Sequence, residues 1–368
     1  MDLDALKNQF RSLPLLLTPS SVQGKTYIVT GSNIGLGLEC SRHLACLGAG
    51  KVVLAVRDTK AKGPAAKQDL IKSLPSIPNL ESVIEVWHLD MSSNASVTSF
   101  VSRAEQELSR IDAVVLNAAT ATGDWEEAEG MESTVHVNVF ATIMLVVLLV
   151  PVLREKYEAQ KRKKGMKGEG VEMPRITVVS SSLGFVRRDD LEKMAVARDD
   201  GRNVLRDLSD KTKWGIGGTN RYALSKLLET VILNYLLTNT TFPSPQPTSH
   251  PAPFPLGTTS VIINYINPGL CKTGLLRYSS IATWIQVTIL RLLVGQTAEW
   301  GSRNLLHGIA GDESTHGRYL SYCRLKGEDV PEWVTAEDGR AWGELLWKEL
   351  REEMERVVPG CTGRVAKG

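Results

Sequence analysis

The stretch Lys25–Gly37, KTYIVTGSNIGLG, decides how the rest of the chain is interpreted. Its first part, Thr26–Thr30, has the β-branched and aromatic composition of a strand. Glycines follow at positions 31, 35 and 37, and residues 38–50 have the composition of a helix. Strand, glycine-rich turn and helix predict a dinucleotide site, because such a turn lets the backbone approach a pyrophosphate at a helix N-terminus. Taken alone, the pattern is also typical of an ordinary tight turn.

The predicted contacts of this turn with the dinucleotide are Gly31, Ser32, Asn33, Ile34, Gly35 and Gly37.

Length, charge and cysteine content narrow the class of protein. The 368 residues suggest about two domains, although α/β folds often run longer as one. A net charge of +2 gives no reason to expect nucleic acid or an anionic membrane as a partner. The five cysteines are scattered without a CxxC pair, which predicts a reducing, cytoplasmic compartment and neither disulfides nor a metal site.

The N-terminus and the apolar segments predict neither a secretory signal nor a transmembrane segment. MDLDALKNQF begins acidic and lacks an apolar signal core. The longest apolar run, Ala141–Leu153, has 13 residues and contains Pro151, so it is too short to span a bilayer and suits a buried helix. Ile281–Val294 predicts an amphipathic helix, either a lid over a pocket or a contact with a membrane surface.

Strand-like and helix-like segments alternate from Lys25 onward. The predicted strands are Thr26–Thr30, Lys51–Val56, Ser82–Asp90, Ile111–Ala119, Arg175–Ser182 and Thr259–Gly269. The predicted helices are 38–50, Lys60–Leu74, Ser96–Arg110, Asn138–Leu153 and Asn220–Leu237. This alternation predicts a single α/β domain with a Rossmann-type doubly wound parallel sheet and helices on both faces.

The predicted domain has additions at its ends and within it. Residues 1–24 form an N-terminal leader, 25–330 the sheet domain, and 331–368 a helical tail on the same domain, with a helix at Ala336–Val357. Insertions are predicted at 157–172, 187–218 and 238–257, the last of them proline-rich.

Two residues at strand ends bear on the kind of dinucleotide. An acidic residue usually receives the ribose 2′-hydroxyl of NAD at the end of the second strand, but here Val56 and Arg57 stand there. A guanidinium would pair with a 2′-phosphate, so Arg57 favours NADP(H); alternatively it is solvated and Asp58 caps the next helix. Asp90 could accept from an adenine amino group, or cap a helix with the serines that follow it.

Tyr222 and Lys226 in YALSK lie four residues apart, on one face of a helix. A nearby ammonium favours a phenolate and lowers the pKa of a tyrosine, which would make Tyr222 a general acid or base. The same spacing is common on ordinary amphipathic helices. Ser181 ends a predicted strand and could bind a substrate oxygen or simply close that strand. Asn138, early in an apolar helix, needs a partner and could hold a water that connects Lys226 to solvent.

Further candidates end the fourth and sixth predicted strands. Asn117 is followed by two alanines, whose small size would let a ribose come close. Pro268 and Gly269 would turn the chain over the cofactor, and Thr273 could bind a carboxamide. Cys271 is interpreted as packing or as a cofactor contact, because no histidine lies near it in sequence to activate it.

Together these motifs resemble the short-chain dehydrogenase/reductase family. TGSNIGLG, Asp90, LNAA, Asn138, the strand end at Ser181, YALSK and NPGLCKTG occur in that family's order. The closer resemblance is to a retinol-dehydrogenase-like branch found in fungi, often in secondary metabolism, and it continues to about Cys323. It implies catalytic roles for Tyr222, Lys226, Ser181 and Asn138, with cofactor contacts by Tyr222 and Lys226, and a homo-oligomer as a possible state.

The sequence departs from the family pattern at two places. Ala119 stands where the fourth-strand motif usually has glycine, and 41 positions separate Ser181 from Tyr222. The inserted segment should form a wall of the substrate pocket. Leu183, Phe185, Trp214 and a helix at Leu275–Leu293 are candidate lining, although core packing explains Phe185 and Trp214 equally well.

The resemblance implies an NADP-dependent oxidoreductase that interconverts an alcohol and a ketone or aldehyde on a small apolar metabolite. Two alternatives stay open at this point. The same fold could perform non-redox chemistry, as an isomerase, dehydratase or cyclase, or it could bind the cofactor without catalysis.

Overall fold

The computed structural model describes residues 9, 11–164, 170–193, 203–213, 218–238, 260–272 and 295–366. Its centre is an eight-stranded sheet in the order β10-β9-β8-β7-β4-β1-β2-β3. The strands are β1 Thr26–Thr30, β2 Lys51–Val56, β3 Ile84–His88, β4 Ala113–Leu116, β7 Arg175–Val179, β8 Ile262–Asn267, β9 Tyr319–Ser321 and β10 Arg324–Leu325. All neighbours pair in parallel except β9 and β10. The predicted doubly wound sheet is confirmed, and β9 and β10 extend it beyond the six predicted strands.

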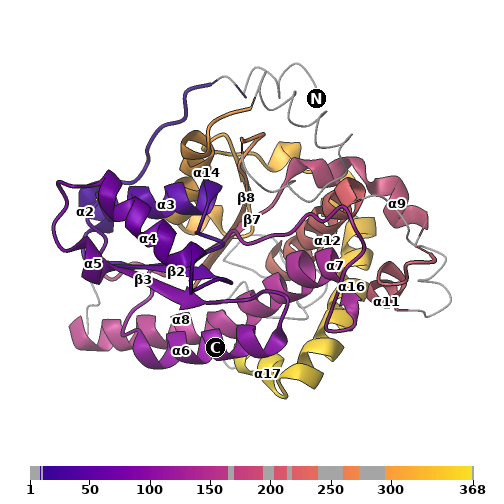
Figure 1. The fold of residues 1–368 in the computed structure, drawn as a ribbon. Helices are drawn as coiled ribbons and strands as arrows, with labels where there is room; N and C mark the ends of the chain where they lie inside the picture. Colours follow the sequence, from indigo (N-terminus) through magenta and orange to yellow (C-terminus); the bar gives the residue numbers. More distant parts are fainter. Residues whose placement is uncertain are drawn as a thin grey trace.

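Apolar helices cover both faces of the sheet. Tyr27 and Val29 of β1 belong to one buried cluster, while Ile28 between them belongs to the other. Successive strand residues point to opposite faces, so burial of both explains why each strand is apolar without alternation. Figure 1 shows α3 and α4 on one side of β2 and β3, and α6 and α8 on the other.

The main helices have the following bounds: α3 Gly35–Cys46, α4 Lys62–Ser73, α6 Asn94–Glu107, α8 Thr142–Lys164, α12 Gly218–Thr238, α14 Ala298–Ala310 and α16 Glu337–Val357. Shorter helical segments are α2 Pro19–Val22, α5 Leu80–Val83, α7 Ser133–Val135, α9 Arg188–Lys193, α11 Val204–Leu208, α15 Glu332–Thr335 and α17 Cys361–Ala366, with a π-helix, η1, at His136–Ala141 and 3₁₀ turns η2 Ser182–Val186, η4 Glu313–Thr315 and η5 Gly327–Asp329. A small hairpin joins β5 Glu127–Ala128 to β6 Met131–Glu132.

The apolar run Ala141–Leu153 forms the first part of α8. The helical run Ser133–Lys163 is long and apolar enough to cross a membrane, and its most apolar window is entirely buried within the protein. Pro151 lies inside α8 without ending it. The apolar surface of this helix is therefore used for packing in the core, as the sequence predicts.

Two of the predicted insertions contain regular structure. α8 continues to Lys164, well into the range 157–172, and α9 and α11 lie within 187–218. The proline-rich range 238–257 and the predicted helix Ile281–Val294 fall outside the described residues, apart from Thr238.

The C-terminal tail packs on the sheet domain through α16. This helix lies against α12, where Gly343 approaches Tyr235 so closely that a Cβ on Gly343 would stand 2.3 Å from the Tyr235 Cβ. The buried Glu349 carboxylate of α16 accepts the Val204 and Leu205 backbone N–H groups at 2.8 and 2.9 Å, which caps α11. The tail thereby fixes a segment of the long insertion.

We expect Gly343→Ala to lower the free energy of unfolding by about 1–3 kcal/mol, the usual cost of overpacking a core. The Tyr235 Cβ is close to its backbone and cannot move aside, so the steric cost exceeds the helix propensity gained with alanine. Chemical denaturation measures the change. Gly327→Ala is the matched control, because a Cβ there meets nothing within 4 Å. Equal stability of the two variants would contradict the assigned packing.

Candidate active site

The glycine-rich turn lies where the order of the strands reverses. β1 has β2 on one side and β4 on the other, and a crevice at the carboxyl ends of two such strands is the usual ligand site of this fold. Gly31 has φ +64°, and a Cβ on it would stand 2.9 Å from the Ala118 Cα. Its N–H donates to Ala55 O at 2.8 Å. Both the positive φ and the close approach to β4 require glycine here.

The turn contains polar groups that have no side-chain or hydrogen-bond partner in the described structure. α3 begins at Gly35, and its N-cap residue Ile34 gives no side-chain hydrogen bond, so the first N–H groups of the helix have no side-chain cap. Ser32 is fully buried, and its Oγ has no hydrogen-bond partner in the described structure. A Cβ on Gly37 would stand 2.7 Å from Asn117 Nδ2. These residues fit a bound pyrophosphate, which would supply acceptors for the N–H groups and for Ser32.

Asn117 holds the turn in place from the end of β4. Its Nδ2 donates to Thr30 O at 2.9 Å and to Gly31 O at 3.3 Å. In return, Thr30 Oγ1 accepts the Asn117 and Ala118 N–H groups, both at 2.9 Å. The predicted cofactor contact of Asn117 stays a prediction, and the structure gives this residue a positioning role. Thr30 is a partner that the sequence reasoning missed, although it begins the TGSN motif.

Arg57 and Asp90 stand at the ends of β2 and β3. Arg57 is exposed, and its carbonyl lies 3.1 Å from His88 Nδ1. Asp58 accepts from the Ala61 and Lys60 N–H groups, and these bonds lower the pKa of its carboxyl. Asp90 Oδ1 accepts from Ser92 N and Oγ, while Ser93 caps α6. Ser93 thus caps α6 as predicted for the serines after Asp90, whereas Asp58 bonds the turn before α4, whose N-cap residue Ala61 has no side-chain cap.

α12 carries the predicted acid–base pair. Tyr222 and Lys226 are buried, at 8% and 3% exposure, and their spacing places them on one face of the helix. Lys226 Nζ donates to Val179 O at 2.7 Å and to Glu229 Oε2 at 2.7 Å. Val179 ends β7, two residues before Ser181. The lysine therefore fastens α12 to the strand end that leads into the predicted catalytic serine.

Ser181 is the N-cap of the 3₁₀ turn η2. Its Oγ accepts the Leu183 N–H at 3.3 Å, and its side chain is 9% exposed. Leu183 is 52% and Val186 76% exposed, so η2 presents apolar side chains to solvent next to the serine. Phe185 instead packs on Tyr319, with ring centroids 5.4 Å apart, which supports core packing for Phe185. Trp214 and Leu275–Leu293 lie outside the described residues.

Asn138 connects the loop after β4 to α12. It lies in the π-helix η1, a rare turn often found at functional sites. Its Oδ1 accepts the Thr120 N–H at 2.9 Å, and its Nδ2 donates to Thr120 O at 2.9 Å and to Ser225 Oγ at 3.0 Å. Ser225 Oγ in turn donates to Tyr222 O at 2.7 Å. The side-chain amide is thus committed to protein partners, and its predicted contact with a water stays a prediction.

The loop after β8 closes the same edge of the sheet. Gly269 has φ +76°, and its N–H donates to Asn267 Oδ1 at 3.2 Å. Leu270 bonds through both its N–H and its carbonyl to the side chain of Gln9, a contact from the leader that the sequence did not predict. Cys271 is buried. Thr273 lies outside the described residues.

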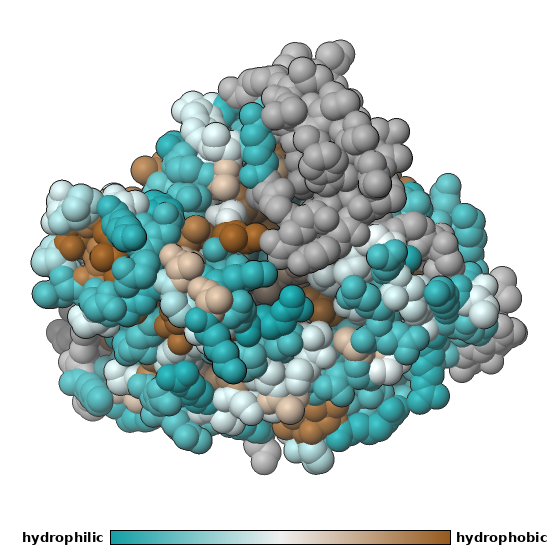
Figure 2. Space-filling model, viewed as in Figure 1, coloured by the Kyte–Doolittle hydropathy of each residue, from teal (hydrophilic) through white to brown (hydrophobic). Residues whose placement is uncertain are grey.

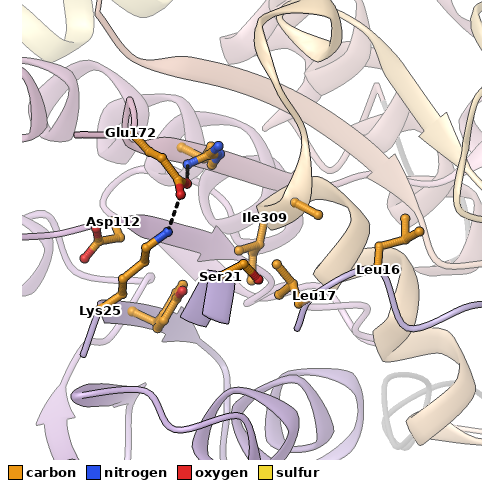
Figure 3. A pocket seen from close by; sticks show the side chains of 10 residues that line it. Leu16, Leu17, Ser21, Lys25, Asp112, Glu172 and Ile309 are labelled. Carbon is orange, nitrogen blue, oxygen red and sulfur yellow. Dashed lines mark hydrogen bonds and ion pairs between the residues drawn. The ribbon is translucent and has the colours of Figure 1, made fainter. Parts of the chain in front are cut away.

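A pocket at the opposite edge of the sheet has a different character (Figure 3). Lys25 bonds Glu172 at 2.8 Å, and Arg175 bonds the same carboxylate at 3.1 Å. Asp112 accepts the Thr26 N–H at 2.8 Å. These charges tie together the amino ends of β1, β4 and β7, so we interpret the pocket as structural. Among the described residues, no three His, Cys, Asp or Glu side chains are grouped as a metal ion requires.

Comparison with known proteins agrees with this geometry. A family model described as short chain dehydrogenase matches residues 25–187. The short chain dehydrogenase/reductase dmxR8 of Cryptosporiopsis is 34% identical over 354 residues, 96% of this chain and 97% of that protein. The short-chain dehydrogenase anuD of Penicillium roqueforti is 32% identical over 92% of this chain and 79% of its own length.

Solved structures show the same fold. A 3-ketoacyl-(acyl-carrier-protein) reductase from Brucella melitensis complexed with NADH has a TM-score of 0.52 and 17% identity, covering 82% of this chain and 97% of its own. The RhlG/NADP complex of Pseudomonas aeruginosa has a TM-score of 0.53 and 17% identity, covering 84% and 98%.

The fold and the crevice define a dinucleotide-binding α/β oxidoreductase. The chain belongs to the short-chain dehydrogenase/reductase family, whose members bind NAD(P)(H).

We expect Gly31→Ala to weaken NAD(P)(H) binding by about tenfold or more, a cost of at least ~1.4 kcal/mol. The added Cβ would push the turn away from Ala118 and displace the start of α3. Fluorescence titration of NADPH measures the change.

Gly24→Ala is the matched control, because Gly24 has a similar φ of +70° but a Cβ there meets nothing within 4 Å. It shares the backbone strain without the clash. Equal loss of binding in both variants would show that strain, and not contact with β4, explains the effect.

Proposed function

We propose that this protein is an NADP-dependent oxidoreductase that interconverts an alcohol and a ketone or aldehyde on a small apolar metabolite. Its relatives come from fungi, and we place its reaction in secondary-metabolite biosynthesis in the cytoplasm. The observation that carries the proposal is the bond from Lys226 Nζ to Val179 O. It brings the face of α12 that holds Tyr222 to the strand end beside Ser181, at the same edge of the sheet as the glycine turn.

Each side chain at this edge has a distinct task in the proposed reaction. Tyr222 holds the proton that is given to a substrate carbonyl oxygen or taken from a hydroxyl. Ser181 Oγ orients that oxygen by a hydrogen bond. Lys226 places a positive charge near the phenol and so favours the phenolate. NADP(H), when bound, supplies or accepts the hydride.

The preference for NADP rests on the end of β2. Val56 stands where NAD-binding members of this fold carry an acidic side chain, and the exposed Arg57 follows. A guanidinium gives two parallel N–H donors to a phosphate, which suits the 2′-phosphate of NADP. Arg57, Asp90 and the turn residues 31–37 would together hold the adenosine half of the cofactor.

The apolar substrate class follows from the surface near the crevice. The exposed large apolar side chains Leu183 and Val186 lie on η2, directly after Ser181, and Ile34 lies in the glycine turn. The face shown in Figure 2 is mostly hydrophilic, with small apolar patches. Apolar side chains near the reacting groups favour a substrate that loses water contact on binding.

We expect Tyr222→Phe to reduce turnover by at least about 10²–10⁴-fold, the usual contribution of a general acid, while NADPH binding stays nearly unchanged. Consumption of NADPH with a panel of apolar ketones and aldehydes measures turnover.

Tyr157→Phe is the matched control. Tyr157 and Lys161 have the same spacing on α8, and the Lys161 ammonium lies 5.2 Å from the Tyr157 ring centroid, but this pair is remote from the strand ends. Full activity of Tyr222→Phe would exclude the assigned reaction. Product formation by the wild type without any change in NADPH would select the non-redox alternative.

We expect Arg57→Gln to lower kcat/KM for NADPH by about tenfold or more, because a charge-assisted bond to the 2′-phosphate is lost. Activity with NADH, which lacks this phosphate, should stay the same and serves as the internal control. A parallel loss with both cofactors would show that Arg57 acts on the fold and not on the 2′-phosphate.

A further inference from the structure

Glu229 is a buried carboxylic acid next to the proposed catalytic lysine. It lies three residues after Lys226 on α12 and has 0% exposure. Its Oε2 accepts from Lys226 Nζ at 2.7 Å, while its Oε1 has no hydrogen-bond partner in the described structure. Burial of a carboxylate is costly unless it is paired, so this position needs an explanation beyond packing.

The bonds of Lys226 leave one donor for a ligand. An ammonium has three N–H groups, and Val179 O and Glu229 Oε2 accept two of them. With two acceptors fixed, one on β7 and one on α12, the direction of the third N–H is also fixed. Glu229 therefore orients the group on which the proposed role of Lys226 depends.

Lys226 is the one charged side chain that acts on Glu229 among the described residues. Burial raises the pKa of the Glu229 carboxyl, and the Lys226 ammonium opposes that rise. The segment directly after β7 presents the hydroxyls of Ser180 and Ser181, and η1 presents the amide of Asn138, all of them neutral.

Several charged groups on the other elements around α12 have partners of their own. Glu132, which precedes α7, pairs with Arg221 of α12, directly before Tyr222, and His136 of η1 bonds Asn94. On α16, Glu349 caps α11. η2 carries no titratable side chain. The Arg221–Glu132 pair carries no net charge, so the field at the Tyr222–Lys226 pair depends on whether Glu229 carries its charge.

We propose that Glu229 is a positioning residue that holds the Lys226 ammonium against β7 and, through its negative charge, sets the pH at which the Tyr222–Lys226 pair releases a proton. This inference rests on the proposed function, because it assigns Glu229 a role in the same acid–base chemistry.

The sign of the effect follows from electrostatics. A negative charge beside the pair opposes loss of a proton from either group, and interacting groups titrate as one unit. Removal of the carboxylate charge makes that loss easier. In the direction of carbonyl reduction, the pair must still hold its proton, so the alkaline limb of the pH profile moves to lower pH.

The test compares Glu229→Gln with the wild type, using kcat/KM for reduction of a carbonyl substrate as a function of pH. We expect the alkaline limb of Glu229→Gln to move down by about one pH unit or more. Glu158→Gln is the control, because it breaks the exposed Glu158–Lys161 pair on α8, which has the same three-residue separation. An unchanged limb in folded Glu229→Gln, or an equal shift in Glu158→Gln, would overturn the proposal.

Glu229→Asp keeps the test decisive if the amide variant does not fold. It retains the charge but withdraws the carboxylate by one methylene, so we expect a shift in the same direction by a smaller amount. Circular dichroism establishes which variants are folded. A folded Glu229→Asp with the wild-type profile would contradict the role of the short contact with Lys226.

A second readout separates this proposal from the proposed function. Ultraviolet difference titration of tyrosinate, with and without Tyr222→Phe, follows Tyr222 without any turnover. If the wild type reduces no carbonyl, the proposed function fails. The role of Glu229 is still supported if Tyr222 loses its proton at lower pH in Glu229→Gln than in the wild type. If Tyr222 loses its proton at the same pH in both proteins, that role is rejected even in an active enzyme.

Discussion

The contact between Gly31 and Ala118 is the constraint on which the site depends. The chain leaves β1 and β4 at adjacent positions of the sheet, and the two strand ends approach so closely that a Cβ on Gly31 would stand 2.9 Å from the Ala118 Cα. The following helices diverge to opposite faces of the sheet. In this fold such a divergence marks the usual ligand site, and the glycine turn lies at this point.

Side chains that bond to backbone groups fix the rest of the site. Asn117 ties β4 to the turn, and Asn138 ties the loop after β4 to Ser225 on α12. Lys226 then ties α12 to the end of β7. Each of these side chains saturates backbone groups that a parallel sheet leaves unpaired at its carboxyl edge. The polar residues at this edge therefore organise loops as well as offering contacts to ligands.

Much of the fold could be predicted because parallel strands buried on both faces have an unmistakable composition. The predicted ranges 51–56 and 26–30 match β2 and β1, while the longer predictions around β3 and β4 included polar residues beyond the strand ends. β9 and β10 were missed because strands of three and two residues carry no periodic signal. Thr30 and Gln9 were missed because their partners are backbone groups distant in sequence, and no local pattern reports such a pairing.

The predicted acid–base residues lie on a helix that is buried nearly all round, and this has a physical cost. Arg221 pairs with Glu132 at 3.3 Å and donates to Asp124 O at 2.9 Å, directly before Tyr222. Lys226 pairs with Glu229 on the other side of the tyrosine. Apolar residues would generally stabilise such a helix as well or better, since buried ion pairs seldom recover the hydration that they lose. What the two pairs provide is direction: one fixes the loop after β4 and the other fixes β7, so Tyr222 lies between two anchored points. Two buried ion pairs flank one phenol, although each costs stability. This arrangement indicates that the pairs maintain the orientation of Tyr222 and not the stability of the helix.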